Sequence, residues 1–96
     1  MDLVFKWDPR KDLANLEKHG IGFSEATSVF SDPLARIFAD PAHSENELRE
    51  IIVGHSLARR LLLVCFAEAA EARVRIISAR GATRKEQHDY EDHVTG

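Results

Sequence analysis

The sequence has a single cysteine and no long apolar run. Cys65 cannot form an internal disulfide, so a disulfide-stapled secreted domain is excluded. It lies within the apolar run 61–67, which predicts an inert core thiol. That run has the length of a strand, whereas a bilayer-spanning helix needs about 20 apolar residues. The start of the chain also lacks the pattern of a secretory signal. We therefore expect a cytoplasmic protein with no membrane contact.

Recognisable metal and nucleotide motifs are also missing. His88 and His93 are five residues apart, not the four that place two ligands on one helix face, and His19, His43 and His55 form no ligand pattern. There is no glycine-rich phosphate loop and no Ser-His-Asp or Cys-His arrangement. The sequence therefore predicts no metal and no cofactor, and a metal-dependent hydrolase is the weakest of the functions considered.

The positive charge of the chain is concentrated in one segment. The whole protein is acidic, with a formal net charge of −3. Between positions 73 and 85, however, there are five cationic side chains and no acidic one: Arg73, Arg75, Arg80, Arg84 and Lys85. Arginine presents a rigid fork to phosphate oxygens, so this segment is a candidate phosphate site. Arginines that solvate an exposed sheet face would give the same pattern, and on the residues alone both interpretations stay open.

Helix signals divide the first third of the chain. After a short strand at 3–7, Asp8 and Pro9 predict the start of a helix that Gly20 ends. Leu13 and Leu16 give this helix an apolar stripe. Ser24 is expected to cap a second, short helix that runs through residue 30 and ends before the Asp-Pro pair at 32–33.

The rest of the chain reads mainly as strands. A capping box formed by Thr83 and Glu86 starts a last helix, which reaches about His93. Before it, we expect a loop at 41–46, turns at 57–59 and 68–72, and strands at 34–39, 49–56, 60–67 and 73–79. The strand at 60–67 reads as central and buried on both faces.

These elements predict one α+β domain over residues 1–96, in the order β-α-α-β-β-β-β-α. Short connections between consecutive strands favour an antiparallel sheet, with the two N-terminal helices packed on one face and a helix at the C-terminus. Alternation along the last strand places Arg73 and Arg75 on the face opposite Val74, Ile76 and Ser78.

Two further positions could join this cationic face. Arg80 is expected just past the end of the last strand. In the strand at 49–56, Arg49 and His55 lie on one side, and they would join the arginines if that side is also the open one. A histidine or tyrosine near this face is a candidate general acid or base.

Several short motifs, in order along nearly the whole chain, are those of a known family. The chain resembles the BrnT toxins of bacterial type II toxin–antitoxin modules, which share the RelE-like ribonuclease fold. The matching motifs are Phe5-x-Trp7-Asp8 with Lys11 and Asn15, Lys18-His19-Gly20, Phe23-x-Glu25-Ala26, Val29-Phe30-x-Asp32-Pro33, Asp40 with His43-Ser44-x-x-Glu47-x-Arg49, and Arg75-Ile76-Ile77-Ser78-Ala79-Arg80-x-Ala82-Thr83 with Glu86 and Tyr90-Glu91.

The resemblance implies a metal-independent endoribonuclease that inhibits translation. It also implies a cognate antitoxin with a DNA-binding domain, which neutralises the toxin in a hetero-oligomer. On this basis we expect a catalytic set and a substrate-binding set of residues. The catalytic set is Arg49, His55, Arg80 and Tyr90, and the substrate-binding set is Arg73, Arg75, Arg84 and Lys85.

Three departures from the family pattern leave a second interpretation open. Glu50 stands where family members often carry an aromatic residue, the turn at 68–72 is alanine-rich, and the chain is less basic than most family toxins. The alternative function is a non-catalytic, degenerate toxin-fold module that still binds an antitoxin or RNA.

Overall fold

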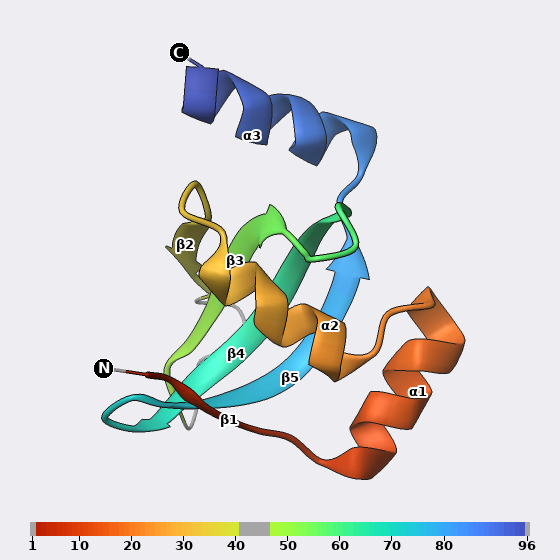
Figure 1. The fold of residues 1–96 in the computed structure, drawn as a ribbon, viewed down its shortest axis with the longest axis vertical. Helices are drawn as coiled ribbons and strands as arrows, with labels where there is room; N and C mark the ends of the chain where they lie inside the picture. Colours follow the sequence, from red (N-terminus) through yellow and green to blue (C-terminus); the bar gives the residue numbers. More distant parts are fainter. Residues whose placement is uncertain (1, 41–46, 96) are drawn as a thin grey trace.

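Five strands form one mixed sheet in the spatial order β1-β5-β4-β3-β2 (Figure 1). The computed structural model describes residues 2–40 and 47–95, so the loop expected at 41–46 lies outside the described residues. The strands are β1 (Val4–Lys6), β2 (Arg36–Ala39), β3 (Arg49–His55), β4 (Leu61–Ala70) and β5 (Arg73–Gly81). The helices are α1 (Pro9–His19), α2 (Phe23–Ser28), the short 3₁₀ helix η1 (Val29–Ser31) and α3 (Arg84–Thr95). The predicted α+β class is confirmed.

The antiparallel order predicted for the four later strands is confirmed, but the first strand is different. β2, β3, β4 and β5 pair as an antiparallel meander with β4 at the centre. β1 pairs in parallel with β5, with Phe5 opposite Val74, so the sheet is mixed and not purely antiparallel. The helices between β1 and the meander carry the chain far enough to permit either direction, and a three-residue strand has too little pattern to fix its pairing.

One face of the sheet forms the core, and we call it the core face. α2 crosses this face (Figure 1) and buries apolar side chains against β4 and β5. The largest fully buried side chains are Phe23, Val29, Leu62, Val64 and Ile76. We call the opposite side the open face. Within residues 61–67, the core side of β4 is fully buried. On the open face Ala67 is buried but the other side chains are only half-buried, in contrast to the prediction of burial on both faces.

α1 begins and ends as predicted, but its buried side is not the apolar one. The Asp8 carboxylate accepts a hydrogen bond from the Arg10 N–H at 2.9 Å, and Gly20 takes the left-handed conformation at φ 71°. Leu13 and Leu16 are 62% and 48% exposed, whereas Asn15 is the buried residue of the helix. α1 therefore docks beside β5 through a polar side chain (Figure 1).

The start of α2 also differs from the prediction. Its N-cap is Gly22, not Ser24, and Gly22 has no side chain that could accept a hydrogen bond. The first helical N–H, that of Phe23, instead donates to the Asp12 carboxylate of α1 at 2.8 Å. A side chain from the preceding helix thus caps α2. Because Asp12 is far from the helix start in sequence, a search for local capping residues cannot detect it.

β5 is longer and less regular than predicted. Cys65 pairs with Ser78 and the next residue, Phe66, pairs with Ile76, so Ile77 is an extra residue in a β-bulge. Beyond the bulge the alternation reverses. Ala79, at 1% exposure, faces the core, and Ser78 does not, contrary to the prediction. Arg80 lies within β5, paired with Leu63, and not past its end.

Gly54 in β3 allows the sheet to approach η1 closely. A Cβ atom at this position would lie 2.9 Å from the Ala35 Cβ and 3.1 Å from the Val29 Cγ1. We expect Gly54→Ala to lower the free energy of unfolding by about 1–3 kcal/mol, because the backbone must shift to make room. Gly81→Ala is the matched control, since no atom lies within 4 Å of its Cβ position. Urea denaturation of both variants measures the effect, and equal stabilities would contradict this account of Gly54.

Candidate active site

A cleft of about 240 Å³ lies on the open face and brings two of the predicted catalytic arginines together. Its polar lining consists of His19, Asp40, Arg49, Cys65, Ser78 and Arg80, and Ile51 and Leu63 are among its apolar lining. We call it the arginine cleft. It draws on α1, β3, β4 and β5, with Asp40 just after β2, so residues far apart in the sequence meet there.

Arg49 reaches the cleft from a row of side chains that crosses three strands. Arg49 pairs with Ala67, and Ala67 pairs with Arg75, so both arginines stand on the open face with the small alanine between them. Glu47 forms ion pairs with both, and its Oε1 lies 3.6 Å from the Arg49 Nε. The side of β3 that carries Arg49 is therefore the open one, which is the condition under which the sequence lets Arg49 join Arg75 across the sheet.

Arg80 is oriented by a carboxylate from α3. Its Nη1 and Nη2 each donate to a different oxygen of Glu86 at 2.8 Å, and Nη1 also donates to the Gly81 carbonyl. Glu86 in addition completes the predicted capping box: it accepts from the Thr83 N–H at 2.9 Å, and Thr83 Oγ1 accepts from the Glu86 N–H at 3.1 Å. These bonds engage three of the five guanidinium N–H groups. The other two N–H groups, on Nε and Nη2, point to the same side of the guanidinium group and can bind a second anion together.

His19 is a cleft residue that was not among the predicted site residues. It is the last residue of α1, and it is exposed. Two signals in the sequence could have identified it: it belongs to the Lys18-His19-Gly20 motif, and it follows Asn15 by four residues, which places both on one helix face.

Asn15 attaches this part of α1 to β5. Its amide nitrogen donates to the carbonyls of Ala79 and Ile21, both at 2.8 Å, and its amide oxygen accepts from the Ala79 N–H at 3.1 Å. The side chain thus bonds to both backbone groups of the residue that precedes Arg80. All three hydrogen bonds are buried, so removal of the amide would leave unsatisfied backbone groups inside the protein.

Cys65 belongs to the cleft and not to the core. It is half-buried on the open face, where its Sγ lies 3.8 Å from an Asp40 carboxylate oxygen. Burial raises the pKa of the Cys65 thiol, and the Asp40 charge raises it further. A thiol held protonated is a poor nucleophile, so Cys65 is not suited to covalent catalysis.

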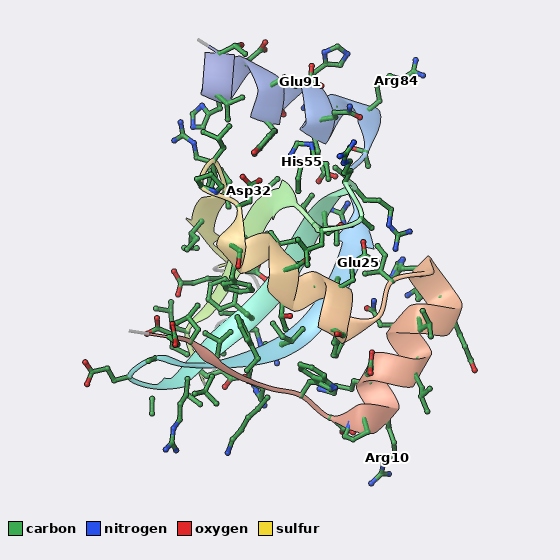
Figure 2. The ribbon with its side chains drawn as sticks, in the orientation of Figure 1. Arg10, Glu25, Asp32, His55, Arg84 and Glu91 are labelled. Carbon is green, nitrogen blue, oxygen red and sulfur yellow. The ribbon has the colours of Figure 1, made fainter. Side chains whose placement is uncertain are left out.

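The predicted catalytic residues His55 and Tyr90 meet elsewhere, around Asp32. Figure 2 shows His55 between the end of the sheet and α3, next to Asp32. The Asp32 carboxylate accepts from the His55 N–H at 2.7 Å and from the Tyr90 hydroxyl at 3.2 Å. The rings of His55 and Tyr90 contact edge to face at a centroid distance of 5.5 Å. His55 is six residues from Arg49 along β3, or about 20 Å.

This cluster fixes α3 to the rest of the protein. Burial opposes ionisation of Asp32, but hydrogen bonds from the His55 and Leu34 N–H groups and from Tyr90 outweigh it and lower the pKa of Asp32. Burial and the Asp32 charge raise the pKa of Tyr90, so its hydroxyl stays a donor. Tyr90 is the buried residue of α3, and between α3 and the open face lies a second, largely apolar cleft of about 410 Å³.

The four predicted substrate-binding residues, Arg73, Arg75, Arg84 and Lys85, do not line the arginine cleft. Arg73 is exposed at the start of β5, two residues before Arg75. Arg84 and Lys85 are exposed in the first turn of α3, and Arg84 points away from the sheet (Figure 2). Within residues 2–40 and 47–95, no three histidine, cysteine or acidic side chains are grouped so that they could hold a metal ion.

Comparison with known proteins identifies the family. Residues 7–86 match the model of the family described as the ribonuclease toxin BrnT of type II toxin–antitoxin systems. The chain belongs to the BrnT family. A crystal structure of the ribonuclease toxin BrnT from Brucella abortus has the same fold, with a TM-score of 0.63 and 23% sequence identity, and the match covers 88% of this chain and 99% of that one. No curated protein matches this chain. In the described part of this BrnT-family chain, no helix is long and apolar enough to cross a membrane.

The ion pair between Glu86 and Arg80 should make stability depend on pH. The hydrogen bond from Arg80 holds the pKa of Glu86 at about 2, below its ordinary value of 4.5. Because the folded state lowers this pKa, the stabilisation is complete above about pH 4.5 and is lost as the pH falls towards 2. We expect Glu86→Gln to lower the melting temperature at pH 7, and the difference from the parent chain to shrink as the pH falls.

Glu91→Gln is the matched control for this measurement. Glu91 lies on the same helix and is exposed (Figure 2). The melting temperature of the Glu91→Gln variant should therefore equal that of the parent chain at every pH. A constant difference between Glu86→Gln and the parent chain from pH 7 to pH 2.5 would contradict the assigned role of the ion pair.

Proposed function

We propose that this BrnT-family chain is an endoribonuclease toxin that cleaves RNA at the arginine cleft without a metal ion. One observation carries the proposal: Arg49 from β3 and Arg80 from β5 line the same cleft, although they are far apart in the sequence. Two guanidinium groups in one cleft can bind a phosphate and stabilise the charge that develops on it during cleavage.

Arg80 is the better oriented of the two. Glu86 holds one side of its guanidinium group, so the fork formed by Nε and Nη2 can bind phosphate while the bidentate ion pair stays in place. Such a donor loses little freedom when it meets the transition state, which is the condition under which electrostatic stabilisation is effective.

The proposed reaction is attack of a ribose 2′-OH on the adjacent phosphate. The arginines stabilise the charge on the phosphate oxygens, and the 5′-oxygen leaves. We assign RNA binding to four cations outside the cleft, which can contact the phosphate backbone at the start of β5 and at the start of α3: Arg73, Arg75, Arg84 and Lys85.

The catalytic role expected for His55 and Tyr90 stays a prediction. Their position around Asp32 suits a positioning role, because Tyr90 holds the helix that supplies Glu86, and Glu86 holds Arg80. We include them in the proposal as residues that act on the site through α3.

The proposed partner is a cognate antitoxin that carries a DNA-binding domain and forms a hetero-oligomer with this chain in the cytoplasm. The family definition supports an antitoxin, since toxins of type II modules are neutralised by one. The alternative is a non-catalytic module that binds an antitoxin or RNA. Expression of the chain with and without its neighbouring gene distinguishes the two, because only an active toxin arrests growth.

The first test of this proposal is cleavage of RNA in EDTA. Because no three histidine, cysteine or acidic side chains of the described residues are grouped to hold a metal ion, we expect the purified chain to degrade RNA at the same rate with and without the chelator. Gel analysis of a defined RNA measures the rate. Activity that vanishes in EDTA and returns with a divalent metal would overturn the metal-independent mechanism.

Substitution of the cleft arginines tests the site itself. We expect Arg80→Ala to reduce the cleavage rate about 100-fold or more, since it removes a donor to the developing charge, and Arg49→Ala to act in the same direction. Arg10→Ala is the matched control, because Arg10 lies near the start of α1, away from the open face (Figure 2). Full activity in Arg80→Ala, in a chain that melts as a folded protein, would remove Arg80 from the site.

A further inference from the structure

The arginine cleft needs a group that accepts a proton. Attack by a ribose 2′-OH releases one, and arginine cannot take it, because the guanidinium group stays protonated. We propose that His19 is a further catalytic residue of the cleft, an inference that rests on the proposed function. Its imidazole takes the proton from the attacking 2′-OH.

The other cleft residues that titrate are less suited to this step. The Cys65 thiol is held protonated by burial and by the Asp40 charge, which raise its pKa. A carboxylate such as that of Asp40 is a weaker base than an imidazole at neutral pH. His55 lies at the opposite end of β3, beside Asp32. Among the described histidines, only His19 lines the arginine cleft.

The position of His19 follows from the attachment of α1 to β5. Asn15 lies one helical turn earlier on the same face of α1, and its side chain bonds to both backbone groups of Ala79. The face that carries His19 is therefore turned towards β5. Ala79 immediately precedes Arg80, so His19 and Arg80 enter the cleft from adjoining parts of its wall.

The backbone on the C-terminal side of His19 is fixed by hydrogen bonds from two other parts of the chain. The Gly20 carbonyl accepts from the Arg60 Nη2 at 3.1 Å, and the Ile21 carbonyl accepts from the Asn15 amide at 2.8 Å. Glu25 holds Arg60 through an ion pair, and the hydrogen bond from Arg60 lowers the pKa of Glu25. The backbone that carries the imidazole is thus held in place beside the cleft, within reach of a ligand bound there.

A neutral ring nitrogen of His19 accepts the 2′-OH proton while the 2′-oxygen forms a bond to phosphorus. The bond between phosphorus and the 5′-oxygen breaks, and the 5′-oxygen takes a proton from water. The products are a 2′,3′-cyclic phosphate and a 5′-hydroxyl. The imidazolium then returns its proton to solvent, so the protein is unchanged after the cycle.

The test compares His19→Gln with the matched control His88→Gln, an exposed histidine of α3. Single-turnover cleavage of a short RNA is measured from pH 5 to 8.5. We expect His19→Gln to be slower about 100-fold or more at pH 7.5, and to lose the rise in rate with pH that deprotonation of an imidazole produces. His88→Gln should keep both the rate and the rise.

Two further readouts separate catalysis from binding and folding. Binding of the same RNA with 2′-O-methyl groups, which cannot react, should be unchanged in His19→Gln, and so should the melting temperature. The groups that share the cleft with His19 and also influence the pH profile are Asp40, Arg49, Cys65 and Arg80, and they are the same in both variants. The comparison therefore isolates the imidazole.

Each contrary outcome has a definite meaning. A His19→Gln chain that keeps the parental rate and pH profile overturns the proposal for His19, although the chain would remain a ribonuclease. A loss of rate that is equal at every pH and accompanied by weaker binding of the 2′-O-methyl RNA also overturns it, because His19 would then be a binding residue. A parent chain that cleaves no RNA overturns the proposed function as well.

Discussion

The extra residue in β5, Ile77, determines which side chains face the cleft. In a regular strand, Arg80 would lie on the same face as Val74 and Ile76, which is the buried core. The bulge reverses the alternation, so Ala79 faces the core and Arg80 reaches the open face opposite Leu63. A buried, unpaired guanidinium group would be strongly destabilising. The bulge therefore lets one strand contribute side chains both to the core and to the arginine cleft. Bulges are frequent next to active sites, where they redirect a side chain in this way.

Asn15 holds the strand in place just past this irregularity. β1 pairs with β5 only as far as Arg75, so the outer edge of β5 needs another partner beyond that point. The Asn15 amide bonds to the N–H and the carbonyl of Ala79, as a neighbouring strand would do. This requirement explains why α1 buries an asparagine and leaves Leu13 and Leu16 exposed. It also couples the end of α1 to the segment that carries Arg80.

The sequence predicts what depends on neighbouring residues and misses what depends on distant ones. Asp8, Gly20 and the capping box at Thr83 act within a few residues, and all of them are where the sequence places them. The parallel pairing of β1, the bulge at Ile77 and the cap that Asp12 supplies to α2 are contacts between separate elements, which no local pattern encodes. Charge alone singled out Arg80, but the meeting of Arg49, Arg80 and His19 in one cleft depends on the packing of separate elements.

Two acids, Glu47 and Glu86, stand beside the arginines of the site, and that pairing limits how RNA can bind. Glu47 neutralises part of the charge of Arg49 and Arg75, and Glu86 that of Arg80. A surface of paired arginines attracts a polyanion less strongly than a free basic patch, in keeping with the net charge of −3. The same pairs hold the guanidinium groups in fixed orientations before a substrate arrives. An acidic protein can thus bind RNA weakly and still stabilise the one phosphate that gains charge in the transition state, which is the difference that catalysis requires.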